Sequence, residues 1–359
     1  MSEVLDLVRP ELRDFAGYAS ARRTQVSGSV WLNANESPQP SLADAGLALN
    51  RYPEPQPVKL RERMASLYGV RTPQLLVTRG SDEGIDLLVR ALCRAGQDAV
   101  LIAPPCFGMY AVCARVQNAN LVEVPLDDVD GTWTLNIERV LAAVSEHSVR
   151  VIFLCSPGNP TGHALSLAQI RGLLEALQGR ALVAVDEAYV EYSSIASASS
   201  LLDEYPGLAV LRTLSKAHAL AGARVGAVLA DPSLIAVLGN ISAPYPVPSP
   251  SAAVAWAALG EPALAQSTRR CRVAIEEREA LFAALVESGL CKRIYRSEGN
   301  YLLVRFDDAE QAFRRLLAAG VVVRDMRSTP MLGDALRISI GTAEENRLML
   351  DALRAETPA

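Results

Sequence analysis

Short apolar runs alternate with segments of helical period through the middle of the chain. The runs predict strands at LLVT (75–78), AVLIA (99–103), LVEV (121–124), VIFLC (151–155), ALVAV (181–185), AVLR (209–212) and VGAVLA (225–230). Their apolar residues are consecutive rather than alternating, which is typical of strands covered by helices on both faces. A stripe at helical spacing predicts one such helix after residue 81, formed by Ile85, Leu88, Val89 and Leu92. The pattern predicts an α/β fold with a mostly parallel seven-stranded sheet.

A second pattern follows the proline-rich stretch SAPYPVPSP at 242–250. It predicts a long helix through 276–289 and strands at NYLLVRF (300–306), VVVR (321–324) and LRISI (336–340). SSIASASSLL at 193–202 predicts a loop, and the first 40 residues contain no predicted strand. We therefore expect an N-terminal arm at 1–40, a large domain at 41–255 and a smaller α+β domain at 256–359.

Polar or Gly/Pro residues follow five of the predicted strands directly. LLVT runs into RGSDE, AVLIA into PPCF, VIFLC into SPGNPTG, ALVAV into DEAY and AVLR into TLSK. In open α/β sheets, ligands bind beyond the carboxyl ends of the strands. Each motif alone could be an ordinary turn, but five in this position predict one shared site.

Composition excludes several classes of protein. With 359 residues, half of them apolar, the chain can bury one large core or two unequal ones. It has no apolar run long enough to cross a membrane, and its acidic N-terminal segment is unlike a secretory signal. The net charge of -5 without a basic block gives no footprint for nucleic acid. The six cysteines form no CxxC pair, as expected for reduced thiols in a cytoplasmic protein.

The three histidines do not indicate a metal site. His147, His163 and His218 are dispersed and have no ligand-like spacing with the cysteines, so we predict no metal. His218 lies two residues after Lys216, and we expect it to be exposed or to cap a helix.

Lysine is rare in this chain. Of 35 basic residues, only Lys59, Lys216 and Lys292 are lysines. A preference for arginine at the surface would explain the bias, but only a primary amine can add to an aldehyde to form an imine. The segment at 213–226 places Lys216 beside hydroxyls and an arginine that suit a phosphorylated aldehyde cofactor, namely Thr213, Ser215 and Arg224. A helix N-cap with a solvated lysine and arginine is the alternative.

Other strand-end residues allow both a chemical and a structural interpretation. Ser81 could cap the following helix, whose N-terminus could bind an anion, while Asp82 and Glu83 equally suit the helix dipole. Asp186 follows an apolar strand and needs a cationic or donor partner, either a cofactor ring nitrogen or a structural ion pair. Phe107 could stack on a ring or belong to the core.

The motifs together resemble the fold-type I PLP-dependent aminotransferases, most specifically the histidinol-phosphate aminotransferase branch. The matching segments are DFAGYASARR (14–23), WLNANESP (31–38), RYPEPQP (51–57), RGSDEG (79–84), PPCFGMY (104–110), CSPGNPTG (155–162), DEAY (186–189), LRTLSKAHALAGARVG (211–226), NYLLVRF (300–306), VVVRD (321–325) and LRISIGT (336–342). The chain departs from the family at Phe107, Gly158 and His218, where Tyr, Asn and an aromatic residue are frequent.

The resemblance assigns roles around pyridoxal 5′-phosphate (PLP). Lys216 would form the Schiff base and carry the proton, Asp186 would pair with the pyridinium, and Asn159 and Tyr189 would hold the phenolate oxygen. Phe107 would stack on the ring. The residues expected around the cofactor phosphate are Ser81, Asp82, Thr213, Ser215 and Arg224, with Tyr52 from the neighbouring subunit of a homodimer.

The resemblance also implies substrates and a pathway. Arg337 would bind the carboxylate of glutamate, and Tyr18, Asn35 and Arg324 would meet the phosphate and imidazole end of L-histidinol phosphate. The implied reaction is ping-pong transamination of L-histidinol phosphate with 2-oxoglutarate, in histidine biosynthesis. An aromatic aminotransferase or a threonine-phosphate decarboxylase of the same branch is the alternative. A non-catalytic PLP-binding module would lack a catalytic group or carry a DNA-binding domain, and the sequence shows neither. The arm is expected to pack with the small domain and the partner subunit.

Overall fold

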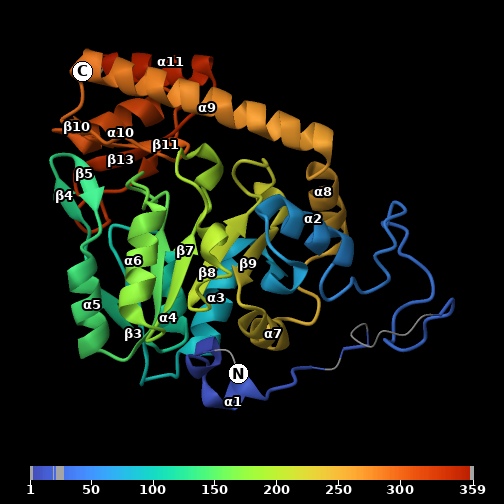
Figure 1. Ribbon diagram of the computed structural model, residues 1–359. Helices are drawn as coiled ribbons and strands as arrows, with labels where there is room; N and C mark the ends of the chain where they lie inside the picture. Colours follow the sequence, from blue (N-terminus) through green and yellow to red (C-terminus); the bar gives the residue numbers. More distant parts are fainter. Residues whose placement is uncertain (1–2, 19, 22–27, 356–359) are drawn as a thin grey trace.

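The computed structural model describes residues 3–18, 20–21 and 28–355 of the 359-residue chain (Figure 1). Residues 1–2, 19 and 22–27 of the predicted arm lie outside the described residues, as do residues 356–359. The DFAGYASARR motif is therefore described only in part.

The seven predicted runs form one sheet. Its strands are β1 (Leu75–Thr78), β2 (Ala99–Ile102), β3 (Asn120–Glu123), β6 (Val149–Cys155), β7 (Leu182–Asp186), β8 (Leu208–Thr213) and β9 (Gly226–Ala230). The order is β1-β9-β8-β7-β6-β2-β3, and only β9 runs antiparallel to its neighbours. The prediction of a mostly parallel seven-stranded sheet is confirmed.

Helices cover both faces of this sheet, as the consecutive apolar positions predicted. They are α2 (Val58–Tyr68), α3 (Gly80–Leu92), α4 (Met109–Val116), α5 (Ile137–Glu146), α6 (Leu167–Leu177), α7 (Pro232–Ile241) and α8 (Ser249–Ala258). Helices α2, α5, α6 and α8 contribute to one apolar core, and α3, α4 and α7 contribute to the other. The carboxyl ends of the central strands are thereby held between two rigid layers.

A four-stranded antiparallel sheet follows the long helix α9 (Figure 1). The elements are α9 (Glu261–Ser288), β10 (Arg293–Ile294), β11 (Tyr301–Arg305), α10 (Ala309–Ala318), β12 (Arg324–Asp325), β13 (Ala335–Ser339) and α11 (Ala343–Arg354). Apolar residues of α9, α10 and α11 pack with the strands in a separate core. The predicted domain boundary between residues 255 and 256 falls inside α8 and stays a prediction.

The strand predicted at VVVR (321–324) is shorter than expected. Only Arg324 and Asp325 pair with β13. Val321 and Val323 pack on the small core, while Val322 is 82% exposed. The three valines alternate between core and solvent without a backbone ladder, so their apolar pattern resembles a strand although no strand forms there.

Short elements connect the larger ones. They are η1 (Glu3–Asp6), α1 (Pro10–Arg13), η2 (Thr72–Gln74), the hairpin β4 (Asp127–Val129) and β5 (Thr132–Thr134), η3 (Val190–Tyr192), η4 (Ala198–Leu201) and η5 (Ala221–Ala223). The predicted loop at 193–202 thus contains one turn of 3₁₀ helix. No helix among the residues that the structure describes is long and apolar enough to span a bilayer.

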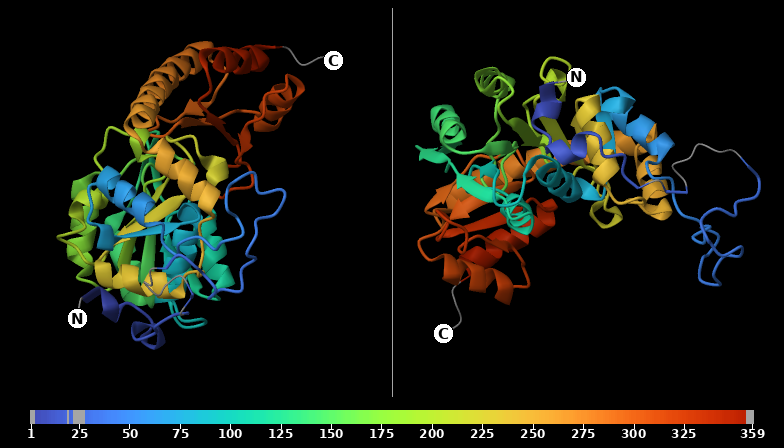
Figure 2. Two further views of the ribbon diagram at one scale, coloured as in Figure 1. Left: turned by 90° about the vertical axis from the view of Figure 1, so that its right-hand side faces the viewer. Right: turned by 90° about the horizontal axis from the view of Figure 1, so that it is seen from below.

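The start of the chain packs on the helices of the large sheet. Val4, Leu7 and Val8 are buried in the core formed with α3 and α7, and the backbone N–H of Arg9 donates to the carbonyl of Ala91 at 3.0 Å. We expected the arm to pack with the small domain. These three residues instead pack on the large sheet, where their apolar side chains fill the α3–α7 side. Residues 28–50 instead form an extended loop that leaves the body of the molecule (Figure 2).

Candidate active site

The strand register brings the polar motifs together at one edge of the large sheet. Cys155, which ends β6, pairs with Asp186 at the end of β7. Gly226, which begins the antiparallel β9, lies opposite both Thr78 and Thr213. The segments at this edge of the sheet therefore lie next to one another. They contain Ser81, Asn159, Asp186, Lys216 and Arg224.

Only one of the three lysines lies at this edge. Lys59 is exposed on α2, and Lys292 donates to Asp334 at 2.9 Å beside the small sheet. Lys216 lies three residues beyond β8. Its Nζ is 5.6 Å from the ring centroid of Tyr189.

The side chain of Lys216 is exposed in the isolated chain, but its surroundings still lower the pKa of its amine. Partial burial of the ammonium end lowers the pKa of Lys216, and the positive charge of Arg337 lowers it further. The negative charge of Asp82, in the first turn of α3, acts in the opposite direction. A lower pKa increases the fraction of free amine available as a nucleophile or base.

Asp186 is 2% exposed and receives two hydrogen bonds. The hydroxyl of Tyr110 donates to Oδ2 at 2.8 Å, and the backbone N–H of Ala188 donates to Oδ1 at 3.2 Å. Burial nevertheless raises the pKa of Asp186 to about 6. This carboxylate is the type of group that a cation at the site would stabilise. Tyr110 was not predicted, although it ends the PPCFGMY motif.

Asn159 links the large and small sheets. Its Nδ2 donates to the hydroxyl of Tyr189 at 3.2 Å, and its Oδ1 accepts a hydrogen bond from Arg337 of β13. Tyr301 of β11 reinforces the junction, because its hydroxyl donates to the carbonyl of Gly158 at 2.7 Å. The predicted ring-binding and carboxylate-binding residues therefore lie in contact.

The N-terminus of α3 lies directly against Gly226. A Cβ atom at Gly226 would come within 2.7 Å of the Ser81 nitrogen. Arg224 approaches the same helix end, where its Nη2 is 3.1 Å from Oδ2 of Asp82. At Gly80 the backbone is left-handed, and a Cβ atom would lie 2.8 Å from Arg224 Nη2. The glycines thus allow an arginine and free helix N–H groups to converge, which is typical of an anion site.

Ser81 does not cap α3, contrary to the sequence prediction. The helix begins at Gly80, with Arg79 at the N-cap position and no side-chain cap. Instead, the carboxylate of Glu83 accepts the backbone N–H of Arg79 at 2.7 Å. This bond satisfies only the N–H of the N-cap residue Arg79, and Ser81 lies inside the helix.

Two hydroxyls flank the approach to Lys216. The Thr213 hydroxyl donates to Ser215 Oγ at 2.9 Å and accepts the backbone N–H of Ser215 at 3.2 Å. Thr213 is buried at the end of β8, whereas Ser215 is partly exposed. The turn is therefore fixed by its own side chains immediately before the lysine.

Two further predicted residues, Phe107 and Arg324, have the following surroundings. Phe107 packs edge to face on Tyr110, with ring centroids 5.7 Å apart. Arg324 is exposed on β12 and lies opposite Arg337 in the strand register.

The arm residues lie further out. Tyr18 borders a cavity of about 80 Å³ near the end of α7, and Asn35 is exposed on the extended loop. Tyr52 stacks on Tyr245 with ring centroids 4.5 Å apart. The structure does not bring these three residues to Lys216 through any contact described within the chain.

Two histidines that sequence analysis set aside lie near the site. His163 is within 2.6 Å of the Thr161 hydroxyl, and a Cβ atom at Gly158 would lie 2.4 Å from His163 Nδ1. The departure from the family at Gly158 is therefore explained by the imidazole packed against it. His218 is 6% exposed, so the expectation that it is exposed or caps a helix is wrong. It packs between the lysine loop and the Glu191 segment.

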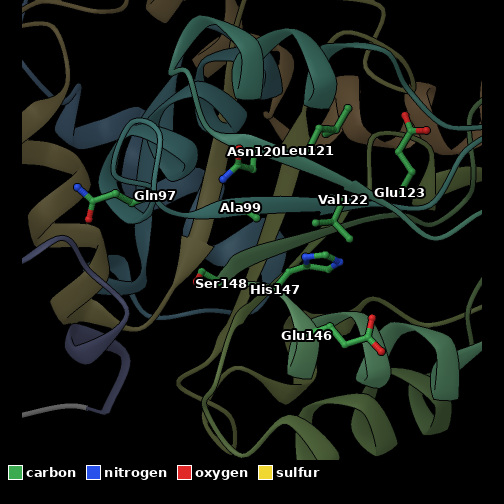
Figure 3. Close-up of a pocket in the computed structure, with 9 residues that line it drawn as sticks. All are labelled: Gln97, Ala99, Asn120, Leu121, Val122, Glu123, Glu146, His147 and Ser148. Atoms are coloured by element: carbon green, nitrogen blue, oxygen red, sulfur yellow. The ribbon is translucent and has the colours of Figure 1, made fainter.

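A surface cavity of about 590 Å³ lies elsewhere, along edge strand β3 (Figure 3). Its lining includes Ala99, Asn120 and Ser148, which lie at or just before the starts of β2, β3 and β6. It is therefore at the amino ends of the parallel strands, opposite to the edge where ligands bind in such sheets. None of the predicted site residues lines it.

Comparison with known proteins agrees with this geometry. Residues 18–353 match the family model described as aminotransferase class I and II. A histidinol-phosphate aminotransferase from Stenotrophomonas maltophilia is 57% identical over 359 residues, which cover all of this chain and 99% of that protein.

Solved structures share the fold. Histidinol-phosphate aminotransferase from Sinorhizobium meliloti, determined in complex with pyridoxal-5′-phosphate, has a TM-score of 0.75 and 23% identity, covering 85% of this chain and 83% of that chain. L-threonine-O-3-phosphate decarboxylase from Porphyromonas gingivalis has a TM-score of 0.73 and 22% identity, covering 85% and 90%. The fold alone does not separate these activities, whereas the full-length identity does. The chain belongs to the class I and II aminotransferases and, within them, to the family of histidinol-phosphate aminotransferases.

Proposed function

We propose that this protein transfers the amino group between L-histidinol phosphate and 2-oxoglutarate, with pyridoxal 5′-phosphate as its cofactor. In the biosynthetic direction it consumes imidazole acetol phosphate and glutamate. The observation that carries the proposal is that Lys216, the buried carboxylate of Asp186 and the N-terminus of α3 lie at the same edge of the large sheet.

The residues at this edge fit the cofactor. Asp186 is a buried acceptor whose raised pKa a pyridinium cation would lower. Asn159 and Tyr189 offer donors for the phenolate oxygen, and Lys216 offers the primary amine. The phosphate would be held by Arg224, Thr213, Ser215 and the first backbone N–H groups of α3, including those of Ser81 and Asp82.

Proton transfer is assigned to Lys216. When bound, the protonated ring withdraws electron density from the substrate Cα and makes its deprotonation feasible. Lys216 Nζ would take that proton and return it, a task that its lowered pKa favours. Arg337 and Arg324 lie opposite one another in the strand register, and guanidinium groups can bind either a carboxylate or a phosphate. Arg337 is assigned to the glutamate carboxylate, and Arg324 to the substrate phosphate.

We further propose that the site is completed in a homodimer. The arm and the loop after it expose large apolar side chains that a partner subunit could cover, namely Val30, Leu32, Leu42, Leu47 and Leu49. Covering them would favour association through the hydrophobic effect. Tyr52 would then reach the cofactor phosphate of the neighbouring subunit, with Tyr18 and Asn35 near its substrate. The proposed location is the cytoplasm, where the free cysteines would stay reduced.

Comparing the turnover of three candidate substrates tests the proposed reaction. Turnover is measured with histidinol phosphate, phenylalanine and threonine phosphate, using 2-oxoglutarate as acceptor and scoring glutamate and released CO₂. The proposal expects the highest kcat/KM for glutamate formation with histidinol phosphate. Absence of glutamate with that substrate would overturn it, and faster reaction with phenylalanine or CO₂ release from threonine phosphate would favour the alternatives. A stable complex with PLP but no turnover of any substrate would indicate a binding module.

A further inference from the structure

A buried charge cluster lies behind the strand ends that carry the site. Arg212, the penultimate residue of β8, donates through Nη2 to Glu191 at 2.6 Å and lies 3.3 Å from Glu187 through Nη1. Its guanidinium carbon is 4.4 Å from the ring centroid of Tyr68. The side chains of Arg212 and Glu187 are only 8% and 3% exposed. Charges this deeply buried are retained only when each finds its partner.

Each of these two residues adjoins a residue of the site. Glu187 follows Asp186, and Arg212 precedes Thr213. Adjacent residues in an extended chain point to opposite faces, so the cluster and the site occupy opposite sides of the same backbone. The Glu187 N–H also donates to the Leu211 carbonyl at 3.0 Å, which joins the two strand ends directly.

Glu187 is itself fixed on its other side. The Ser197 hydroxyl donates to Oε2 and the Ala198 N–H donates to Oε1, both at 2.6 Å. Burial raises the pKa of Glu187, while the ion pair to Arg212 and the bonds from Ser197 and Ala198 oppose that rise. The cluster therefore ties η4 to the ends of β7 and β8.

His218 extends the cluster past Lys216. Its Nε2 is 4.0 Å from Oε1 of Glu191, and both ring nitrogens are buried without a hydrogen-bond partner. Oε2 of Glu191 and Nε of Arg212 are also buried and unpaired. Electrostatic interactions between buried polar atoms are strong, so their energy changes markedly when the distances between the atoms change. The lysine is thus flanked by the cluster on both sides along the chain, at Arg212 and at His218.

We propose that Arg212, with Glu187 and Glu191, is a positioning group for the reaction: it fixes the ends of β7 and β8 so that Asp186 and Lys216 keep their separation. This inference rests on the proposed function. The cluster touches neither substrate nor cofactor, and acts through the backbone that carries the residues that do. Small displacements of a reacting group are costly, since about 1 Å can reduce a rate roughly 100-fold.

The test compares Arg212→Met with a matched ion pair elsewhere. Arg171 pairs with Glu204 and lies 5.6 Å from the ring of Tyr205, so Arg171→Met removes a similar set of contacts at an exposed position. The readouts are kcat, KM, the Kd of the apoprotein for PLP, and the titration midpoint of the visible chromophore. We expect Arg212→Met to lower kcat and raise the Kd by about 10-fold each and to shift the midpoint. Arg171→Met should leave all four unchanged.

Two further variants keep the test informative if Arg212→Met does not fold. Glu191→Gln removes one charge at nearly constant shape and should shift the same readouts in the same direction by a smaller amount. Arg212→Lys keeps the charge and should restore part of the loss. Wild-type Kd and midpoint in both Glu191→Gln and Arg212→Lys, with only Tm lowered, would overturn the inference. Failure of the wild-type enzyme to turn over histidinol phosphate would instead overturn the proposed function, because Kd and midpoint are measured without substrate.

Discussion

Asp186 is held at a free-energy cost in the protein without a bound cation. It is buried, and its two hydrogen bonds do not offset the loss of water, since its pKa is raised to about 6 from an ordinary value of 3.8. The folded state therefore binds a proton more tightly than the unfolded state between these two pH values. Stability is lost as pH rises from about 4 to about 6, and the loss remains at neutral pH.

Replacing this carboxylate should stabilise the apoprotein. Asp186→Asn keeps the shape and an acceptor for Ala188, and removes the charge. The difference between about 6 and 3.8 corresponds to about 3 kcal/mol, which we expect the variant to gain at pH 8 and to lose progressively as pH falls towards 4. Urea denaturation of apoprotein at several pH values measures it. An apo variant less stable than wild type at pH 8 would contradict the account, and the same variant should bind PLP more weakly.

At the residue scale, the sequence predicted the candidate site residues from their chemistry, but not the residues that hold them in place. Asp186, Asn159 and Lys216 were predicted because each follows an apolar strand directly. Tyr110 was missed, since a tyrosine inside a helix looks like core until its hydroxyl is found on Asp186. His218 was misjudged because it is buried beside Glu191, a neighbour that is distant in sequence.

At the element scale, the start of β9 shapes the proposed phosphate site. Gly226 pairs with the ends of both β1 and β8, and its missing side chain lets α3 approach. The opposing atoms belong to the backbone, at 2.6 Å from Gly80 C and 2.7 Å from Ser81 N, so they cannot rotate away as a side chain could. In the segment GARVG (222–226), the final glycine is therefore required by sterics, and Arg224 supplies the positive charge.

Gly226→Ala should weaken phosphate binding. The added methyl group would push the N-terminus of α3 away from Arg224, and we expect the Kd for PLP to rise about 10-fold, with a parallel loss for inorganic phosphate as a competitor. Gly172→Ala is the control, because a Cβ atom there meets nothing within 4 Å on α6. Equal affinities in the two variants would show that this contact does not shape the site.

Strands of the large sheet were predictable because burial on both faces leaves consecutive apolar residues. The bounds of the edge strand β12 were not, since it has only two residues, and the predicted valines before it pack on the small core without pairing. The hairpin β4–β5 also escaped prediction, because its strands of three residues, DDV and TWT, carry no apolar run. Long-range pairing decides such short strands.

At the scale of the whole molecule, the extended loop is the feature that a single chain does not explain. Leu32 is 88% exposed and Leu42 is fully exposed, although both belong to a chain with large apolar cores. Of the predicted residues, Asn35 belongs to this loop, while Tyr18 precedes it and Tyr52 follows it in the chain. Sequence alone could place them only by resemblance, since their partners belong to the proposed second subunit.

Charged substitutions in the extended loop should disrupt the proposed homodimer. Leu32→Asp with Leu42→Asp would be nearly neutral in an isolated chain, but would disrupt a surface that a partner covers. We expect sedimentation to show monomer and the Kd for PLP to rise, because Tyr52 would no longer reach the neighbouring site. Val322→Asp is the matched control, an apolar residue 82% exposed on the small domain. A double variant whose subunits associate as tightly as those of the wild type would contradict the proposed role of the extended loop.

Reductive trapping tests whether Lys216 is the amine that binds the cofactor. The purified protein is expected to be yellow and to lose that colour on reduction with borohydride. Peptide mass spectrometry should then place the pyridoxyl group on Lys216, and Lys216→Ala and Lys216→Arg should show neither the label nor transamination. A label on Lys59 or Lys292 would contradict the account.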